Sequence, residues 1–148
     1  DVCSSDLSVV RLSGERVDKR ARHWQQIVAS ACEQCGRNHL PQVLPLLSLP
    51  DWLGEQMNAR KNSHDGAPGN LYFMLVPTAE KGLRDFPEAA TVAALTLLVG
   101  PEGGFAPEEE AAARATGFVP LRLGGRILRT ETAALAAVAA LQALWGDY

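Results

Sequence analysis

The chain has 148 residues, 47% of them hydrophobic and 21% charged, with a net charge of −3. This composition indicates one folded domain rather than a disordered segment, and the acidic balance argues against a general nucleic-acid binder. The longest nearly uncharged segment, residues 132–146, is shorter than the roughly 20 apolar residues of a spanning helix. No basic and apolar leader opens the chain, so we expect a cytoplasmic protein that binds no membrane.

The predicted elements alternate between apolar runs and amphipathic segments, which favours an α/β fold with a mostly parallel sheet covered by helices. In chain order we expect a strand at 7–12, a helix at 15–35, a strand at 42–47, a helix at 50–59, an exposed loop at 60–70, strands at 71–76 and 94–99, a helix from Pro107, a strand at 118–123 and a helix at 132–145. In the first helix, apolar residues recur every three or four positions and predict one buried stripe.

Basic residues gather in the first quarter of the chain. They are Arg11, Arg16, Lys19, Arg20, Arg22 and Arg37. A local basic face can bind phosphates on an acidic protein, although a solvated helix face explains the same residues.

Two cysteines in this region, Cys32 and Cys35, have the spacing of a zinc or redox motif. The chain offers no second pair, so a metal site is weakly supported and a small buried residue is the better interpretation. The total of three cysteines is odd and argues against a disulfide framework.

A glycine-rich turn, Gly100-Pro101-Glu102-Gly103-Gly104, connects the strand at 94–99 to the helix from Pro107. The first turn of that helix carries Glu108, Glu109 and Glu110, which would repel an anion at the helix N-terminus. The turn also lacks the spacing of a phosphate-cradling loop or a dinucleotide fingerprint. A neutral or cationic cofactor is therefore a better ligand here than a nucleotide phosphate.

A second strand, glycine and helix junction follows at Gly124-Gly125. Junctions of this kind place their loops at the same carboxyl edge of a parallel sheet, which predicts a shared pocket. Within the second junction, Arg129 and Glu131 flank Thr130. This cluster indicates either a catalytic site or a helix cap, by Thr130 or Thr132, with a local ion pair.

The final helix is apolar nearly all round, with Gln142 as its only strongly polar interior residue. Such a helix must be buried on more than one side. A homodimer interface is the simplest explanation in a domain of this size.

Three ordered motifs resemble the 16S ribosomal RNA uridine-N3 methyltransferases of the RsmE type. They are Glu33-Gln34-x-x-Arg37, Gly100-Pro101-Glu102-Gly103-Gly104-Phe105, and Leu123-Gly124-x-Arg126-Ile127-Leu128-Arg129-x-Glu131-Thr132-Ala133. The resemblance covers residues 9–148, whereas residues 1–8 do not look like the family and are interpreted as linker or non-native residues. Family members also carry an N-terminal PUA-like RNA-binding domain, which we do not expect in a chain of this length.

The resemblance implies a SPOUT-type, trefoil-knotted methyltransferase domain that forms a homodimer through the knot and the last helix. It implies S-adenosylmethionine (SAM) as cofactor, no metal, and the small ribosomal subunit or its 16S RNA as partner. By resemblance, the cofactor-binding residues are Leu75, Val76, Val99, Gly100, Pro101, Glu102, Gly103, Leu123, Gly124, Ile127, Leu128 and Ala133. The expected catalytic residues are Arg129, Glu131 and Glu102, and the expected RNA-binding residues are Lys19, Arg22, Gln34 and Arg37.

Two other functions are compatible with these residues. A SPOUT enzyme acting on another ribosomal or transfer RNA base would carry the same cofactor site. A non-catalytic RNA-binding module for ribosome assembly would use the basic helix, but it has no need of two glycine junctions at one sheet edge.

Overall fold

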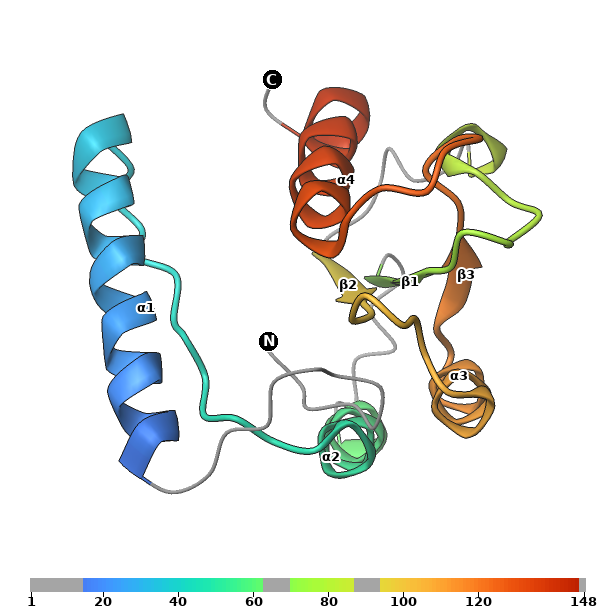
Figure 1. The fold of residues 1–148 in the computed structure, drawn as a ribbon, viewed down its shortest axis with the longest axis horizontal. Coiled ribbons are helices and arrows are strands. Elements are labelled where there is room, and N and C mark those ends of the chain that lie inside the picture. The colour runs from blue at the N-terminus through green and yellow to red at the C-terminus, as the bar shows by residue number, and fades with distance from the viewer. Residues whose placement is uncertain (1–14, 63–69, 87–93, 147–148) are drawn as a thin grey trace.

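The computed structural model describes residues 15–62, 70–86 and 94–146. Its elements are α1 (Glu15–Cys35), α2 (Leu49–Asn62), β1 (Asn70–Leu75), the short 3-10 helix η1 (Leu83–Asp85), β2 (Ala94–Val99), α3 (Pro107–Ala115), β3 (Val119–Leu121) and α4 (Thr130–Trp145) (Figure 1). The strand expected at 7–12 and the residues interpreted as linker lie outside the described part.

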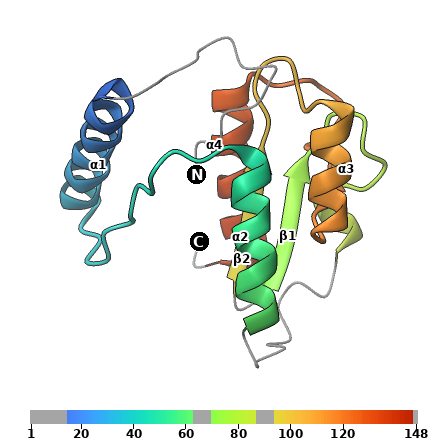
Figure 2. The same cartoon turned by 90° about the horizontal axis from the view of Figure 1, so that it is seen from below.

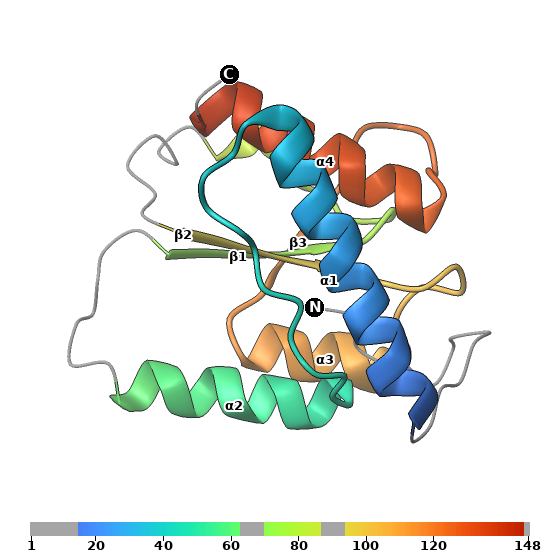
Figure 3. The same cartoon turned by 90° about the vertical axis from the view of Figure 1, so that its left-hand side faces the viewer.

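The sheet is parallel, with strand order β2-β1-β3. Phe73 in the central strand pairs with Leu97 of β2 and with Val119 of β3. α4 covers one face of the sheet, and α2 and α3 cover the other (Figure 3). The expected parallel sheet between helices is confirmed.

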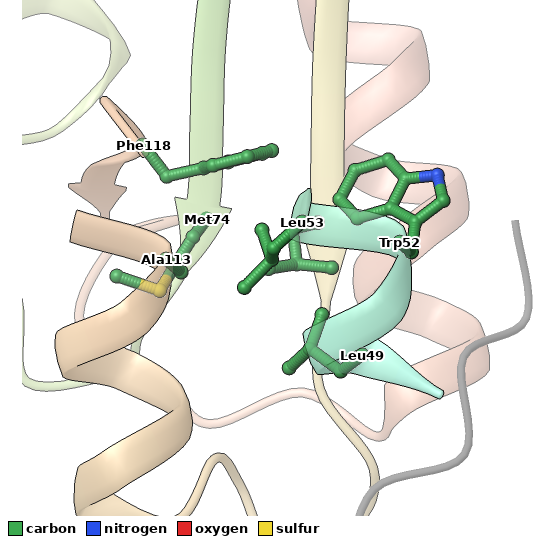
Figure 4. Close-up of a cluster of buried hydrophobic side chains, with 7 residues drawn as sticks. Leu49, Trp52, Leu53, Met74, Ala113 and Phe118 are labelled. Atoms are coloured by element: carbon green, nitrogen blue, oxygen red, sulfur yellow. The ribbon is translucent and has the colours of Figure 1, made fainter. Parts of the chain in front are cut away.

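Successive residues of β1 point to opposite faces of the sheet, as the pleat requires. Met74 is fully buried against α2 and α3, in a cluster with Trp52, Leu53 and Phe118 (Figure 4). Phe73 is fully buried on the other face, where its ring lies 6.4 Å from that of Trp145 in α4. Burying a Phe or Met side chain contributes about 1.5–3 kcal/mol, so β1 holds both layers to the sheet.

The strand expected at 42–47 is wrong. This segment follows α1 as irregular chain, and the amide of Gln25 takes the place of a neighbouring strand: its Nε2 donates to the Pro41 carbonyl at 3.0 Å, and its Oε1 accepts from the Val43 N–H at 2.8 Å. Pro45 has no N–H to offer a ladder, and Leu44 remains 52% exposed. Apolar content alone misled the prediction.

α1 stands beside the layered part of the domain (Figures 1 and 2). The apolar stripe expected to be buried is half buried at its first four residues and exposed at its last two: Val17, Ala21, Trp24, Val28, Ala31 and Cys35. Cys32, outside that stripe, is the one buried residue among those described in the helix. The periodicity correctly predicted the helix, but it did not predict how much of the helix surface the rest of the chain covers.

Smaller differences concern element ends. α2 runs three residues further than expected, to Asn62, and β3 is shorter because Phe118 turns into the core while Arg122 forms only an isolated bridge to Gly82. α4 begins at Thr130 with Arg129 as its N-cap, and no side chain caps it. The proposed capping by Thr130 or Thr132 is therefore wrong.

Candidate functional site: a cavity between two glycine loops

The loops that follow β1, β2 and β3 meet at the carboxyl edge of the sheet, the upper end in Figure 2. They enclose a cavity of about 320 Å³, within the size range of small-molecule sites. Its walls are formed by Leu75, Val76, Pro77, Val99, Gly100, Pro101, Glu102, Gly104, Leu121, Arg122, Leu123, Gly124, Arg126, Ile127, Leu128, Arg129, Thr130 and Ala133. The pocket expected between the two glycine junctions is present.

The first loop is a tight turn closed by the Gly104 N–H, which donates to the Pro101 carbonyl at 2.9 Å. Gly104 has φ +79°, a conformation that glycine adopts at no steric cost. At Gly100, an added Cβ would lie 3.1 Å from the ring of Phe105. The backbone therefore passes directly against that ring, and only glycine leaves the ring in place.

The second loop is tied to the rest of the edge by backbone hydrogen bonds. The Val76 N–H donates to the Leu121 carbonyl at 3.0 Å, and the Arg122 N–H donates to the Lys81 carbonyl at 2.8 Å. The loop then turns at Gly124, which has φ +90°. It ends where the Ala133 N–H donates to the Arg129 carbonyl at 2.7 Å, in the first turn of α4.

Most of the cavity wall is aliphatic side chain and backbone, and its charged members are Arg122, Arg126, Arg129 and Glu102. All four are exposed and lie at the mouth rather than in the interior. The α3 glutamates, Glu108 to Glu110, do not line it. The arrangement suits a ligand with apolar parts and polar groups that the loop backbones can meet.

The structure brings together all the residues expected to bind the cofactor except Gly103, which does not line the cavity. Of the residues expected to be catalytic, Glu102 and Arg129 line it. Glu131 does not, since it is exposed in the first turn of α4. The cavity therefore favours Glu102 over Glu131 as the carboxylate nearest a bound ligand.

Several lining residues were not among those expected to bind the cofactor or to be catalytic: Pro77, Gly104, Leu121, Arg122, Arg126 and Thr130. Two of these residues could have been identified from the sequence. Arg122 and Arg126 flank the second glycine pair, and basic residues beside a loop at a carboxyl edge are placed to meet a ligand.

The residues expected to bind RNA lie elsewhere. Lys19, Arg22 and Gln34 are exposed on α1, and Arg37 is exposed just after it. None of them lines the cavity. Lys19 and Gln34 are separated by fifteen helical positions, about 22 Å along the helix axis, so they cannot contact one nucleotide.

The two cysteines differ in exposure. Cys32 is buried, with its Sγ 3.9 Å from the His39 carbonyl, whereas Cys35 is exposed with its Sγ 3.7 Å from the Cys32 carbonyl. Across residues 15–62, 70–86 and 94–146, no three His, Cys, Asp or Glu side chains gather as a metal would require.

The described helices include none with the length and apolar character needed to cross a membrane.

A parallel sheet with helices on both faces and a cavity at its carboxyl edge defines a ligand-binding domain of the α/β class. The chain belongs to a family described as RNA methyltransferase domain, whose model matches residues 2–142.

Individual relatives support the same assignment. The chain is 38% identical over 130 residues to a Buchnera aphidicola protein named Ribosomal RNA small subunit methyltransferase E, covering 87% of this chain and 48% of that protein. Among solved structures, it resembles a Legionella pneumophila protein in complex with bound SAM (TM-score 0.82, 37% identity, 97% of this chain and 54% of that one). It also resembles the Neisseria gonorrhoeae Ribosomal RNA small subunit methyltransferase E bound to S-adenosyl methionine (TM-score 0.74, 40% identity, 95% and 54%). The chain thus spans about half the length of these relatives.

Proposed function

We propose that this chain is the catalytic domain of a SAM-dependent methyltransferase that modifies N3 of a uridine in 16S ribosomal RNA. The observation that carries the proposal is the cavity, since the two motifs that resemble the RsmE-type enzymes supply most of its wall. The SAM-bound structures of two relatives support the cofactor. A ribosomal RNA substrate would place the enzyme in the cytoplasm.

The residues at the cavity fit SAM. The interior walls are aliphatic, as an adenosyl group requires, and the Gly100 to Gly104 turn brings backbone close to whatever occupies the cavity. The bound molecule would carry a positive sulfonium, and Glu102 is the acidic side chain among the lining residues.

SAM, when bound, supplies an electrophilic methyl group. The residues of this chain supply orientation and electrostatics. Uridine N3 carries a proton at neutral pH, so a carbon bond to N3 can form only as that proton leaves. Arg129 at the mouth stabilises the negative charge that develops on a uracil oxygen. Glu102 orients the base or accepts the proton, directly or through water.

The target uridine must be unpaired when it reacts, because N3 lies on the Watson-Crick edge. The proposal assigns RNA binding at a distance from the cavity to the exposed residues on and just after α1: Lys19, Arg22, Gln34 and Arg37. In a full-length relative the PUA-like domain would add to this contact.

The proposal includes a trefoil knot formed by the two glycine loops, and a homodimer. Support for the dimer comes from α4. Ala137 and Leu141 are buried, whereas Leu135 is 74% exposed and Val138 is 53% exposed. Among the described residues, the helix expected to be buried on more than one side is therefore covered on one side only. Ile127 in the second loop is 83% exposed as well.

The proposed function is tested by identifying the methylated nucleoside. Small-subunit RNA incubated with the purified chain and methyl-labelled SAM, then digested to nucleosides, should yield labelled 3-methyluridine. Another labelled nucleoside would favour the SPOUT enzyme acting on a different base. No label from a chain that binds both RNA and SAM would favour the non-catalytic module.

A further inference from the structure

The charge at the cavity mouth has the opposite sign to the charge of the whole chain. The chain contains 14 Lys and Arg against 17 Asp and Glu. The charged residues that line the cavity are three arginines, Arg122, Arg126 and Arg129, and one carboxylate, Glu102. The mouth therefore carries a local excess of positive charge on an acidic protein. Such a local excess favours the binding of an anion.

The two signs come from different segments of the chain. Glu102 belongs to the loop between β2 and α3, whereas all three arginines belong to the connection from β3 to α4. The carboxylate and the guanidinium groups are thus supplied by separate loops. A ligand with separate neutral and anionic parts matches this division.

The arginines are available to a ligand. All three side chains are exposed, and within the described residues no ion pair or hydrogen bond engages their guanidinium groups. Arg122 is nonetheless held in place, because its N–H donates to the Lys81 carbonyl and its backbone bridges to Gly82. Charged groups on a fixed backbone lose less entropy when they bind than groups on a mobile one.

We propose that Arg122 and Arg126 bind the phosphate groups that flank the target nucleotide of a single-stranded RNA. This rests on the proposed function, in which the cavity holds the methyl donor and Arg129 meets the base. The planar guanidinium matches the oxygens of a phosphate and stays charged at any working pH. The N-terminus of α4, where Thr130 lines the cavity, adds its positive dipole end, and the exposed Glu131 subtracts from it.

This assignment gives the RNA two separate contacts. The α1 residues bind RNA phosphates far from the reacting base, whatever the RNA sequence. Arg122 and Arg126 hold the RNA backbone on either side of the extruded uridine. The proposal assigns them to the RNA rather than to the cofactor, because SAM carries no phosphate. Phosphate contacts of this kind position a nucleic acid without reading its sequence.

The experiment measures binding of a fluorescein-labelled single-stranded oligoribonucleotide with one central uridine, with S-adenosylhomocysteine present, at several salt concentrations. The variants are Arg122→Gln, Arg126→Gln and their combination. A double variant with lysine at both positions keeps the charge. Arg114→Gln is the matched control, because Arg114 is an exposed arginine on α3 that pairs with Glu110 and does not line the cavity.

We expect the double glutamine variant to bind the RNA about tenfold more weakly. The slope of log K against log salt should fall by about 1.4, or 0.7 per lost phosphate contact. Lysine at both positions should keep most of the slope, and Arg114→Gln should leave it unchanged. In all variants the SAM dissociation constant, measured by calorimetry, should stay within about twofold of the unaltered chain.

An unchanged slope in a folded double variant would overturn the inference, as would an unaltered chain with no measurable RNA binding. A loss of SAM affinity with intact RNA binding would also overturn it, since the arginines would then serve the cofactor. These outcomes are distinct from failure of the proposed function, which would appear as absent SAM binding in the unaltered chain.

Discussion

At the scale of single residues, Arg129 allows the proposed catalytic role to be tested separately from cofactor binding. Its side chain is exposed at the cavity mouth, while its carbonyl accepts the first hydrogen bond of α4. Arg129→Ala removes only the side chain, so the helix start should survive. We expect methylation to fall by about 10²- to 10³-fold, the usual effect of removing one donor to a developing negative charge. SAM affinity should change by less than about twofold.

Radiolabel transfer and calorimetry measure the two effects of Arg129→Ala. Arg129→Lys, which keeps the charge, should recover part of the activity. If SAM affinity and methylation fell together, Arg129 would be a structural or cofactor-binding residue.

Gly100 lines the cavity and packs directly against the Phe105 ring. In Gly100→Ala the new Cβ would lie 3.1–3.3 Å from three carbons of the Phe105 ring, so the ring or the loop must shift. We expect SAM affinity to fall about tenfold, roughly 1.4 kcal/mol. Gly125→Ala is the control, because its Cβ would meet nothing within 4 Å. Equal SAM affinity in the two variants would contradict the proposed role of this loop in holding SAM.

At the scale of elements, α3 starts with half of a capping box. The Ala106 N–H donates to Oε2 of Glu109 at 2.8 Å, but alanine has no side-chain oxygen to return a bond to the helix. Ala106→Ser should therefore raise the free energy of unfolding by about 1 kcal/mol. Urea unfolding followed by circular dichroism measures the change, with Ala106→Gly expected to gain less. A stability equal to or below the original would show that the cap is not limiting.

α4 offers a test of the proposed dimer. Leu135 is on the exposed side of the helix, opposite the buried Ala137 and Leu141, so Leu135→Glu should leave the monomer fold intact. We expect the unaltered chain to sediment as a dimer and the variant as a monomer in analytical ultracentrifugation. Ala112→Glu places the same charge at an exposed site of α3 and should leave the dimer intact. A dimer that survives Leu135→Glu would move the interface elsewhere.

Prediction of the elements succeeded where one face of a segment is regularly apolar and failed where a single side chain decides the conformation. The helix at 15–35 and the strand at 94–99 have the expected bounds, and the strand pairs along its whole length with β1. The segment 42–47 has the composition of a strand, yet Gln25 satisfies its backbone from a distance of eighteen residues in sequence. Periodicity within a segment holds no information about such a partner.

At the scale of the whole molecule, the position of the cavity could be predicted because the topology of parallel sheets is regular. Two strand, glycine and helix junctions lead to one edge, and Gly100 and Gly124 both line one cavity there. The orientation of individual side chains could not be predicted in this way. Glu131 is two residues from Arg129 in sequence, but it does not line the cavity, whereas Thr130 and Ala133 of the same first turn of α4 do.

The placement of α1 was also beyond sequence reasoning. Its stripe predicts contact with something apolar, but the described part of the chain covers that stripe only partly. What a helix face packs against depends on long-range contacts that its own residues do not specify.

The central claim is that the cavity between the two glycine loops binds SAM. Calorimetric titration of the purified chain with SAM tests it most directly, since the measurement needs neither RNA nor a further domain. We predict saturable binding of one SAM per protomer, displaced by S-adenosylhomocysteine and weakened in Gly100→Ala but not in Gly125→Ala. A folded chain that takes up no SAM, or one whose affinity is the same in both glycine variants, would contradict the account.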